Sequence, residues 1–274
     1  MRIYRLILIC LAPVILTACP RPPTTPLPYE TVRLADIQIQ ERDAMIIGEK
    51  IWFNESSKRL EYLTFWNENE AFASMGIAHF LWHPAGQTGQ FEETFPELLR
   101  FMYARGVALP TWLQSGPPCP WNNRNEFMRD FNSPRMVELR NILANNVVQQ
   151  TLFMLKRLEA APRLLLANLP PARRDHVENQ FYRVARAPNG IYALADYLNF
   201  KGYGLSEMER YNGMGWGLLQ ALESMPGNTN DPVNEFANAA QAMLRRRIEN
   251  SQPAQGEQRW WPGWVSRLNT YRIR

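Results

Sequence analysis

Apolar residues along most of the chain recur every three or four positions, which is the spacing of amphipathic helices rather than of strands. The longest such pattern covers 133–162, where Ser133 is suited to cap a helix and Pro134 to occupy its first turn. A largely apolar stripe along this segment consists of Met136, Leu139, Leu143, Val147, Thr151, Met154 and Leu158. The pattern predicts one long central helix.

The same spacing predicts further helices and a mainly α fold. They cover 43–60, 92–104, 171–186, 190–199, 216–224 and 232–250. Gly106 follows the helix at 92–104, and Asp231 stands before Pro232 at the start of the last helix, as is typical of helix ends and beginnings.

Two long irregular segments, 64–91 and 106–125, interrupt the helical pattern. Long irregular segments in a compact domain often carry functional sites. The first is expected to contain a short β-hairpin, which would be the only sheet. The second is rich in proline and tryptophan.

The N-terminus has the pattern of a secretory leader, because Arg2 and Arg5 accompany an apolar run that ends in small residues and Cys19. This run is too short to cross a bilayer as a helix. Leu16-Thr17-Ala18-Cys19 resembles the lipobox of bacterial lipoproteins, in which the leader is removed and the cysteine is acylated. We therefore expect a signal peptide over 1–18 and lipid on Cys19.

Residues 19–30 are rich in proline, a composition that favours extended chain and does not form a packed core. We expect this segment to tether a single domain over 31–274. Lipoproteins of the kind that this leader resembles go to the outer membrane unless an acidic residue follows the cysteine, and here Pro20 follows it. The resemblance implies an outer membrane lipoprotein at the periplasmic face, held in the membrane lipid by acylated Cys19.

Composition excludes several function classes. Only Cys119 remains in the domain once Cys10 leaves with the leader and Cys19 carries lipid, so no disulfide is predicted. The formal net charge is only +4, and Arg245-Arg246-Arg247 is interpreted as a solvated helix face, so nucleic acid is not an expected partner. His83 and His176 lack acidic or cysteine partners at ligand spacing, and neither a metal site nor a cofactor is predicted.

Glu55 is the first candidate for catalysis. It follows Ile51 by one helical turn, so its carboxyl group is expected beside an apolar surface that includes Trp52. Such burial disfavours the charged form and would raise the pKa of Glu55 toward that of a general acid. The alternative interpretation is a solvated helix acid like Glu49.

The residues that follow Glu55 resemble the phage-type lysozymes. The segment Ser74-Met75-Gly76-Ile77-Ala78-His79 is similar to a strand and turn of that family, which comes after its catalytic glutamate and a second acid. Ala78 stands where glycine is usual, and the segment from Glu55 to His79 is about four residues longer than in the family. The resemblance implies a lysozyme-like helical domain with a small β-hairpin lobe.

Residue roles follow from this resemblance. It implies that Glu55 is the general acid, that Glu68 is the second carboxylate and that Ser74 positions the attacking water. If Glu68 points into solvent, Asn67 or Glu70 is the candidate on that loop.

Substrate-binding residues are expected in the same region. Trp66 and Trp82 would stack on sugar rings, and Trp112 and Trp121 are further candidates, although tryptophan is also ordinary core material. Asn67 would donate hydrogen bonds to the glycan, and His79 would hold the region of Glu55.

The predicted function is that of a lipid-anchored periplasmic glycosidase, similar to a muramidase, that cleaves the glycan strands of peptidoglycan. One alternative is a lytic transglycosylase, in which a hydroxyl of the substrate attacks instead of water. Others are a non-catalytic lipoprotein that binds glycan or protein through a lysozyme-like groove, and a helical scaffold with an accidental resemblance.

The anchor leads to a direct prediction. Because acyl chains rather than a membrane helix would hold the protein, Cys19→Ala should release it from the membrane fraction or leave the signal peptide attached. Fractionation followed by immunoblotting measures this, and unchanged membrane association would contradict the lipobox.

Overall fold

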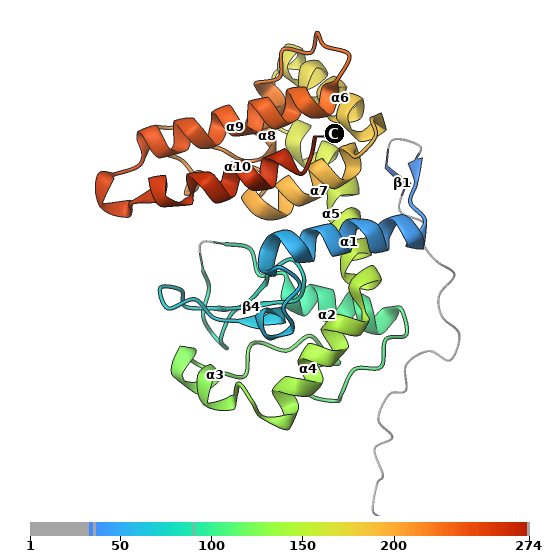
Figure 1. The fold of residues 1–274 in the computed structure, drawn as a ribbon, viewed down its shortest axis with the longest axis vertical. Helices are drawn as coiled ribbons and strands as arrows, with labels where there is room; N and C mark the ends of the chain where they lie inside the picture. Colours follow the sequence, from blue (N-terminus) through green and yellow to red (C-terminus); the bar gives the residue numbers. More distant parts are fainter. Residues whose placement is uncertain (1–32, 35–36, 90, 273–274) are drawn as a thin grey trace, which may run out of the picture.

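Helices make up most of the structure, a computed structural model that describes residues 33–34, 37–89 and 91–272. Within these ranges the chain forms ten α-helices and two small antiparallel sheets, which confirms the prediction of a mainly α fold (Figure 1). The expected signal peptide, Cys19 and the proline-rich tether lie outside the described residues. None of the helices that are described is both long and apolar enough to cross a bilayer.

Most predicted helices are present, with bounds shifted by a few residues. The α-helices are α1 (Glu41–Ser56), α2 (Phe95–Ala104), α3 (Arg124–Asp130), α4 (Pro134–Asn145), α5 (Val147–Leu166), α6 (Pro171–Arg186), α7 (Gly190–Lys201), α8 (Leu218–Glu223), α9 (Pro232–Asn250) and α10 (Trp261–Asn269). Short 3-10 turns are η1 (Leu60–Leu63), η2 (Pro253–Gln255) and η3 (Glu257–Trp260). The predicted caps are confirmed, because Ser133 and Asp231 accept hydrogen bonds from backbone N–H groups in the first turns of α4 and α9.

The predicted single central helix is wrong, because it is divided into α4 and α5. Asn146 lies between them and leaves helical geometry, with φ −126° and ψ 42°. The apolar stripe continues through this break, so periodicity alone did not reveal it. Two helices were not predicted: α3 has only 7 residues, and α10 carries Pro262 and Gly263, which are typical turn residues, in its first turn.

The segment 64–91 contains a three-stranded antiparallel sheet rather than a simple hairpin. β3 (Thr64–Phe65) pairs with β4 (Ala73–Met75), which pairs with β5 (Phe80–Trp82). A second ladder joins β1 (Arg33–Leu34) to β2 (Ile37–Gln38), so the expectation of only one sheet is wrong. Strands of two residues are too short to give an alternating pattern.

Helix α1 lies in the middle of the molecule and packs along α5. Helices α6 to α10 are on one side of α1, and the three-stranded sheet with α2, α3 and α4 is on the other (Figure 1). Helix α5 runs through both groups, and one cluster of buried apolar side chains includes residues of both. The C-terminal end of α1 is therefore close to residues of both groups.

Gln150 of α5 fixes the turn between β4 and β5. Its fully buried side chain accepts a hydrogen bond from Ile77 N (3.0 Å) and donates from Nε2 to the carbonyls of Leu143 (2.7 Å) and Asn146 (3.0 Å). Gly76 adopts φ +75°, and a Cβ atom there would lie 2.3 Å from Gln150 Oε1. The close approach requires glycine, and it holds the turn against the central helices.

Replacing Gln150 therefore should weaken the fold. In Gln150→Leu the buried N–H of Ile77 loses its acceptor, which should lower the free energy of unfolding by about 1–3 kcal/mol. Urea unfolding followed by circular dichroism measures the change. The neighbouring Gln149→Leu is the control, and an equal loss in both variants would contradict the anchoring role.

Candidate functional site

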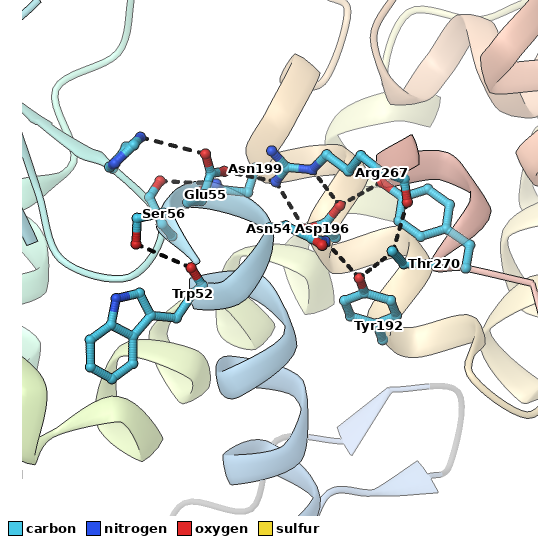
Figure 2. Close-up of polar contacts among 12 residues, drawn as sticks. Trp52, Asn54, Glu55, Ser56, Tyr192, Asp196, Asn199, Arg267 and Thr270 are labelled. Atoms are coloured by element: carbon cyan, nitrogen blue, oxygen red, sulfur yellow. Dashed lines mark hydrogen bonds and ion pairs between the residues drawn. The ribbon is translucent and has the colours of Figure 1, made fainter. Parts of the chain in front are cut away.

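Glu55 lies in the last turn of α1. The residue that caps this helix, Ser57, has a left-handed backbone conformation (φ 52°). Its side chain keeps 15% of its surface exposed and is held between two partners. Arg267 Nη2 of α10 lies 2.7 Å from Glu55 Oε1, and His79 Nδ1 lies 3.5 Å from Glu55 Oε2. Figure 2 shows Glu55 and Arg267 pointing toward each other. The carboxyl group thus faces the sheet through one oxygen and the C-terminal helices through the other.

His79 belongs to the tight turn between β4 and β5 and has a positive φ of 53°. Its ring is stacked on Phe65 of β3, with centroids 6.1 Å apart. Asn199 of α7 donates to the carbonyl of the preceding residue, Ala78, at 2.9 Å. These contacts orient His79 toward Glu55, as the sequence analysis expected of a residue that holds the region of the acid.

Arg267 is shared by two carboxylates. Its Nε and Nη2 donate to the fully buried Asp196 at 2.7 and 2.9 Å, in addition to the bond to Glu55. Tyr271 OH also donates to Asp196, at 2.6 Å. Figure 2 shows this network continuing to Asn54, Tyr192 and Thr270, where Asn54 Nδ2 donates to Tyr192 OH at 2.7 Å. Hydrogen bonds therefore connect the site to α7 and α10.

The environment of Glu55 differs from the expected one. Burial alone would raise the pKa of Glu55, but the charges of Arg267 and His79, and more weakly Lys201, outweigh it and lower the pKa below its ordinary value of 4.5. The expectation of a raised pKa is wrong, because the sequence did not reveal the arginine that lies 212 positions away. In this state Glu55 is an ionised carboxylate at neutral pH.

Cations and aromatic rings alternate beside this ion pair. The guanidinium of Arg267 lies 4.2 Å from the ring centroid of Phe200, Lys201 Nζ lies 3.8 Å from the same ring, and Lys201 Nζ lies 4.1 Å from the ring of Trp264. The guanidinium of Arg247 lies 5.4 Å from the ring centroid of Trp264. We call these residues, Arg267, Phe200, Lys201, Trp264 and Arg247, the cation–aromatic row.

Arg247 corrects one sequence interpretation. It was expected on a solvated helix face with Arg245 and Arg246, but its side chain is only 16% exposed. Its Nε and Nη2 donate to the buried Glu257 at 2.8 and 2.6 Å, and its guanidinium lies 4.1 Å from the ring of Trp216. The run of three arginines in the sequence does not indicate that the side chain of Arg247 is more buried than an arginine on a solvated helix face.

Glu209 is a second carboxyl group near the row. It is half-buried, and Oε2 lies 3.6 Å from where a Cβ atom on Gly202 would be. Burial raises the pKa of Glu209, and the charges of Arg247 and Lys201 only partly oppose this. Glu55 and Glu209 both interact with Lys201, yet their pKa values shift in opposite directions.

The other predicted catalytic residues, Glu68 and Ser74, have surroundings different from those of Glu55, and their assigned roles stay predictions. The side chain of Glu68 is 79% exposed and pairs with Arg124 at 3.4 Å. Ser74 is buried in β4, opposite Phe65 and Leu81 of the neighbouring strands. Among the described residues the ion pairs of Glu55 are with Arg267 and His79.

Glu70, the alternative acid on that loop, is half-buried, and burial raises its pKa. Its backbone carbonyl accepts a hydrogen bond from Trp66 Nε1 at 2.8 Å. Asn67 is also half-buried, and its Oδ1 accepts a hydrogen bond from Asn69 N at 3.1 Å. The roles assigned to Asn67 and Glu70 stay predictions.

Trp66 and Trp82 do not present sugar-binding faces in this structure. Trp66 is 2% exposed and Trp82 is fully buried. Trp82 packs on Phe95 and Trp121 and donates from Nε1 to the carbonyl of Pro117 at 2.7 Å. Both rings belong to the core. Trp260, which the sequence analysis did not select, is 44% exposed.

Other chemistry is not indicated near Glu55. In the described part of the chain no group of three or more histidine, cysteine, aspartate or glutamate side chains is placed to hold a metal ion. Cys119 is buried, and burial raises the pKa of its thiol to about 12, so it does not provide a thiolate nucleophile.

The stabilising contribution of Glu55 should depend on pH in a defined direction. The pKa of Glu55 is lower in the folded protein than its ordinary value of 4.5, so folding favours the ionised form. The contribution is present above 4.5 and is lost as pH falls through the lower folded pKa. As pH falls from 4.5 through the folded pKa of Glu55, the difference in unfolding free energy between the wild-type protein and Glu55→Gln should become smaller. Glu49→Gln is the control variant. A difference independent of pH would contradict the lowered pKa.

Comparisons with known proteins give no relative for this arrangement. No family model matches the chain, and neither does any curated protein or solved structure.

Proposed function

We propose that this protein is a peptidoglycan-cleaving glycosidase in which Glu55 is the essential carboxyl group. The observation that carries the proposal is the position of Glu55, which is partly exposed at the end of α1 and pairs with His79 of the β4–β5 turn on one side and with Arg267 of α10 on the other. The mainly helical fold with a small sheet after α1 supports a lysozyme-like arrangement of domain and lobe.

The charge state of Glu55 suits glycoside cleavage. The transition state has the character of an oxocarbenium ion, and an ionised carboxylate beside it stabilises the developing positive charge. To act as the acid for the leaving oxygen, Glu55 must first gain a proton. A bound glycan that excludes water would favour the neutral form, and Arg267 would keep both of its bonds to Asp196 if Glu55 released it.

The position of Glu68 bears on the alternative chemistry. Water attack with inversion needs a second carboxylate to act as the base, whereas internal attack by a substrate hydroxyl can proceed with one. Because Glu68 is 79% exposed, the lytic transglycosylase reaction is the second candidate. The two reactions differ in product, since the internal reaction gives an anhydro sugar that lacks one water.

Location supports the substrate class. An acylated Cys19 in the outer membrane, followed by a proline-rich tether, would place the domain in the periplasm beside peptidoglycan. This part of the proposal is independent of the site geometry.

The decisive test is Glu55→Gln, which keeps the size of the side chain and removes its charge and proton. We expect cleavage of purified peptidoglycan to fall by about 10²–10⁴-fold, the usual contribution of a catalytic acid or base. Glu49→Gln changes an exposed acid on the same helix, with 52% of its side chain exposed, and should retain full activity.

Mass spectrometry of the released muropeptides reads out both rate and mechanism. Products with a reducing end indicate a hydrolase, and anhydro products indicate a transglycosylase. Full activity of Glu55→Gln, or no cleavage by the wild-type protein, would refute the proposed enzyme.

A further inference from the structure

Lys201 is the cation in the row that has no carboxylate partner. Arg267 is bonded to Asp196 and Glu55, and Arg247 is bonded to Glu257. Among the described residues no carboxylate oxygen lies within ion-pair distance of Lys201 Nζ, which lies over the rings of Phe200 and Trp264. The two rings are arranged edge to face, with centroids 6.4 Å apart.

The surroundings make this unpaired amine unfavourable in its charged form. Burial first, and then the charges of Arg247 and Arg267, hold the pKa of Lys201 well below its ordinary value of 10.5, and Glu257 and Glu55 only partly oppose them. Three carboxylates near the row, those of Glu55, Asp196 and Glu257, are already bonded to the two arginines, and burial raises the pKa of Glu209, which favours its neutral form. An additional anion next to Lys201 would therefore relieve the repulsion among the three cations.

We propose that Lys201 binds a carboxylate group of the glycan substrate at a subsite next to Glu55. Lys201 Nζ and the Arg267 guanidinium lie 3.8 and 4.2 Å from the centroid of the same Phe200 ring, and Arg267 is bonded to Glu55 at 2.7 Å, so a sugar at Glu55 would bring a substituent toward Lys201. The rings of Phe200 and Trp264 contact the amine itself and stabilise its charged form, and a charge-assisted bond from the amine to a carboxylate would be stronger than a neutral hydrogen bond. The inference rests on the proposed glycosidase and narrows its substrate to anionic glycans.

Two carboxylates of peptidoglycan have the required chemistry. One is the lactyl carboxylate of a muramyl sugar in a strand without peptides, and the other belongs to a stem peptide. Chitooligosaccharides have the same sugar backbone without either group. The subsite predicts that strands carrying a carboxylate bind more tightly than chitooligosaccharides of equal length.

Binding of the anion should also be linked to proton uptake. The charged groups that face Lys201 are Glu55 from α1, Arg247 from α9, Glu257 from η3 and Arg267 from α10, with Glu209 from the loop after α7. Lys201 has no carboxylate partner in the described structure, so a bound anion should raise the pKa of Lys201 more than it raises the pKa of these neighbours. Affinity for the anionic glycan should therefore rise as pH falls through the pKa of Lys201.

The test compares Lys201→Met with its parent, both in the Glu55→Gln background so that no ligand is cleaved. Methionine keeps an apolar stem against the rings and removes the charge. Isothermal titration calorimetry with strands lacking peptides, strands with peptides and chitooligosaccharides measures affinity. Titrations in two buffers with different ionisation enthalpies measure proton uptake.

We expect Lys201→Met to weaken binding of at least one carboxylate-bearing strand by about tenfold or more, a loss typical of a hydrogen bond to a charged group. Affinity for the chitooligosaccharide should stay within about twofold, and proton uptake on binding the anionic strand should fall. Lys201→Arg, which keeps the charge, should restore most of the affinity. Lys58→Met removes an exposed lysine, with 39% of its side chain exposed, and controls for net charge.

The outcomes separate this inference from the proposed function. Equal losses for anionic and neutral ligands, or no loss at all, would overturn the subsite while leaving the glycosidase intact. Failure of the parent protein to bind any of the glycans would refute both. Unfolding midpoints of Lys201→Met and Lys201→Arg show whether a change in affinity reflects a change in the fold.

Discussion

The ion pair between Arg267 and Asp196 is the interaction on which the site depends. Removing two charges from water costs several kcal/mol for each, and only good geometry with additional hydrogen bonds offsets that cost. Here the guanidinium donates twice to a fully buried carboxylate, and Tyr271 supplies a further donor. Loss of Arg267 would leave Asp196 as a buried charge without its cation, a change that costs about 3–5 kcal/mol. The pair therefore fixes α10 against α7 and presents Arg267 to Glu55.

Around this pair the protein collects ionisable groups whose pKa values are shifted in different directions. The pKa of Glu55 is lowered by cations, that of Glu209 is raised by burial, and that of Lys201 is lowered by burial and by its arginine neighbours. Such groupings are frequent at functional sites, although structural ion pairs also produce them. The site combines a partly exposed carboxylate with a lysine that has no carboxylate partner among the described residues.

Local patterns predicted the helices and part of the site. The spacing of apolar residues located most helices, and the motif from Ser74 to His79 correctly placed a turn and a histidine beside Glu55. The same patterns failed for Glu68 and for Trp66 and Trp82, because exposure depends on how a loop or ring packs in three dimensions. Arg267, Lys201 and Arg247 were missed because the residues that surround them lie on α1, α7, α9, η3 and α10, and no short-range signal links these segments.

The contact between Glu55 and Arg267 spans 212 positions of the chain. During synthesis α1 emerges early, and α10 is the last helix of the described chain to be made. Until α10 is complete, Asp196 has no arginine to neutralise it and Glu55 lacks the cation that sets its charge state. A chain interrupted before α10 would carry a buried aspartate without its partner, a defect that opens the structure to proteases. The site can therefore form only after α10 has been synthesised and has packed against α7.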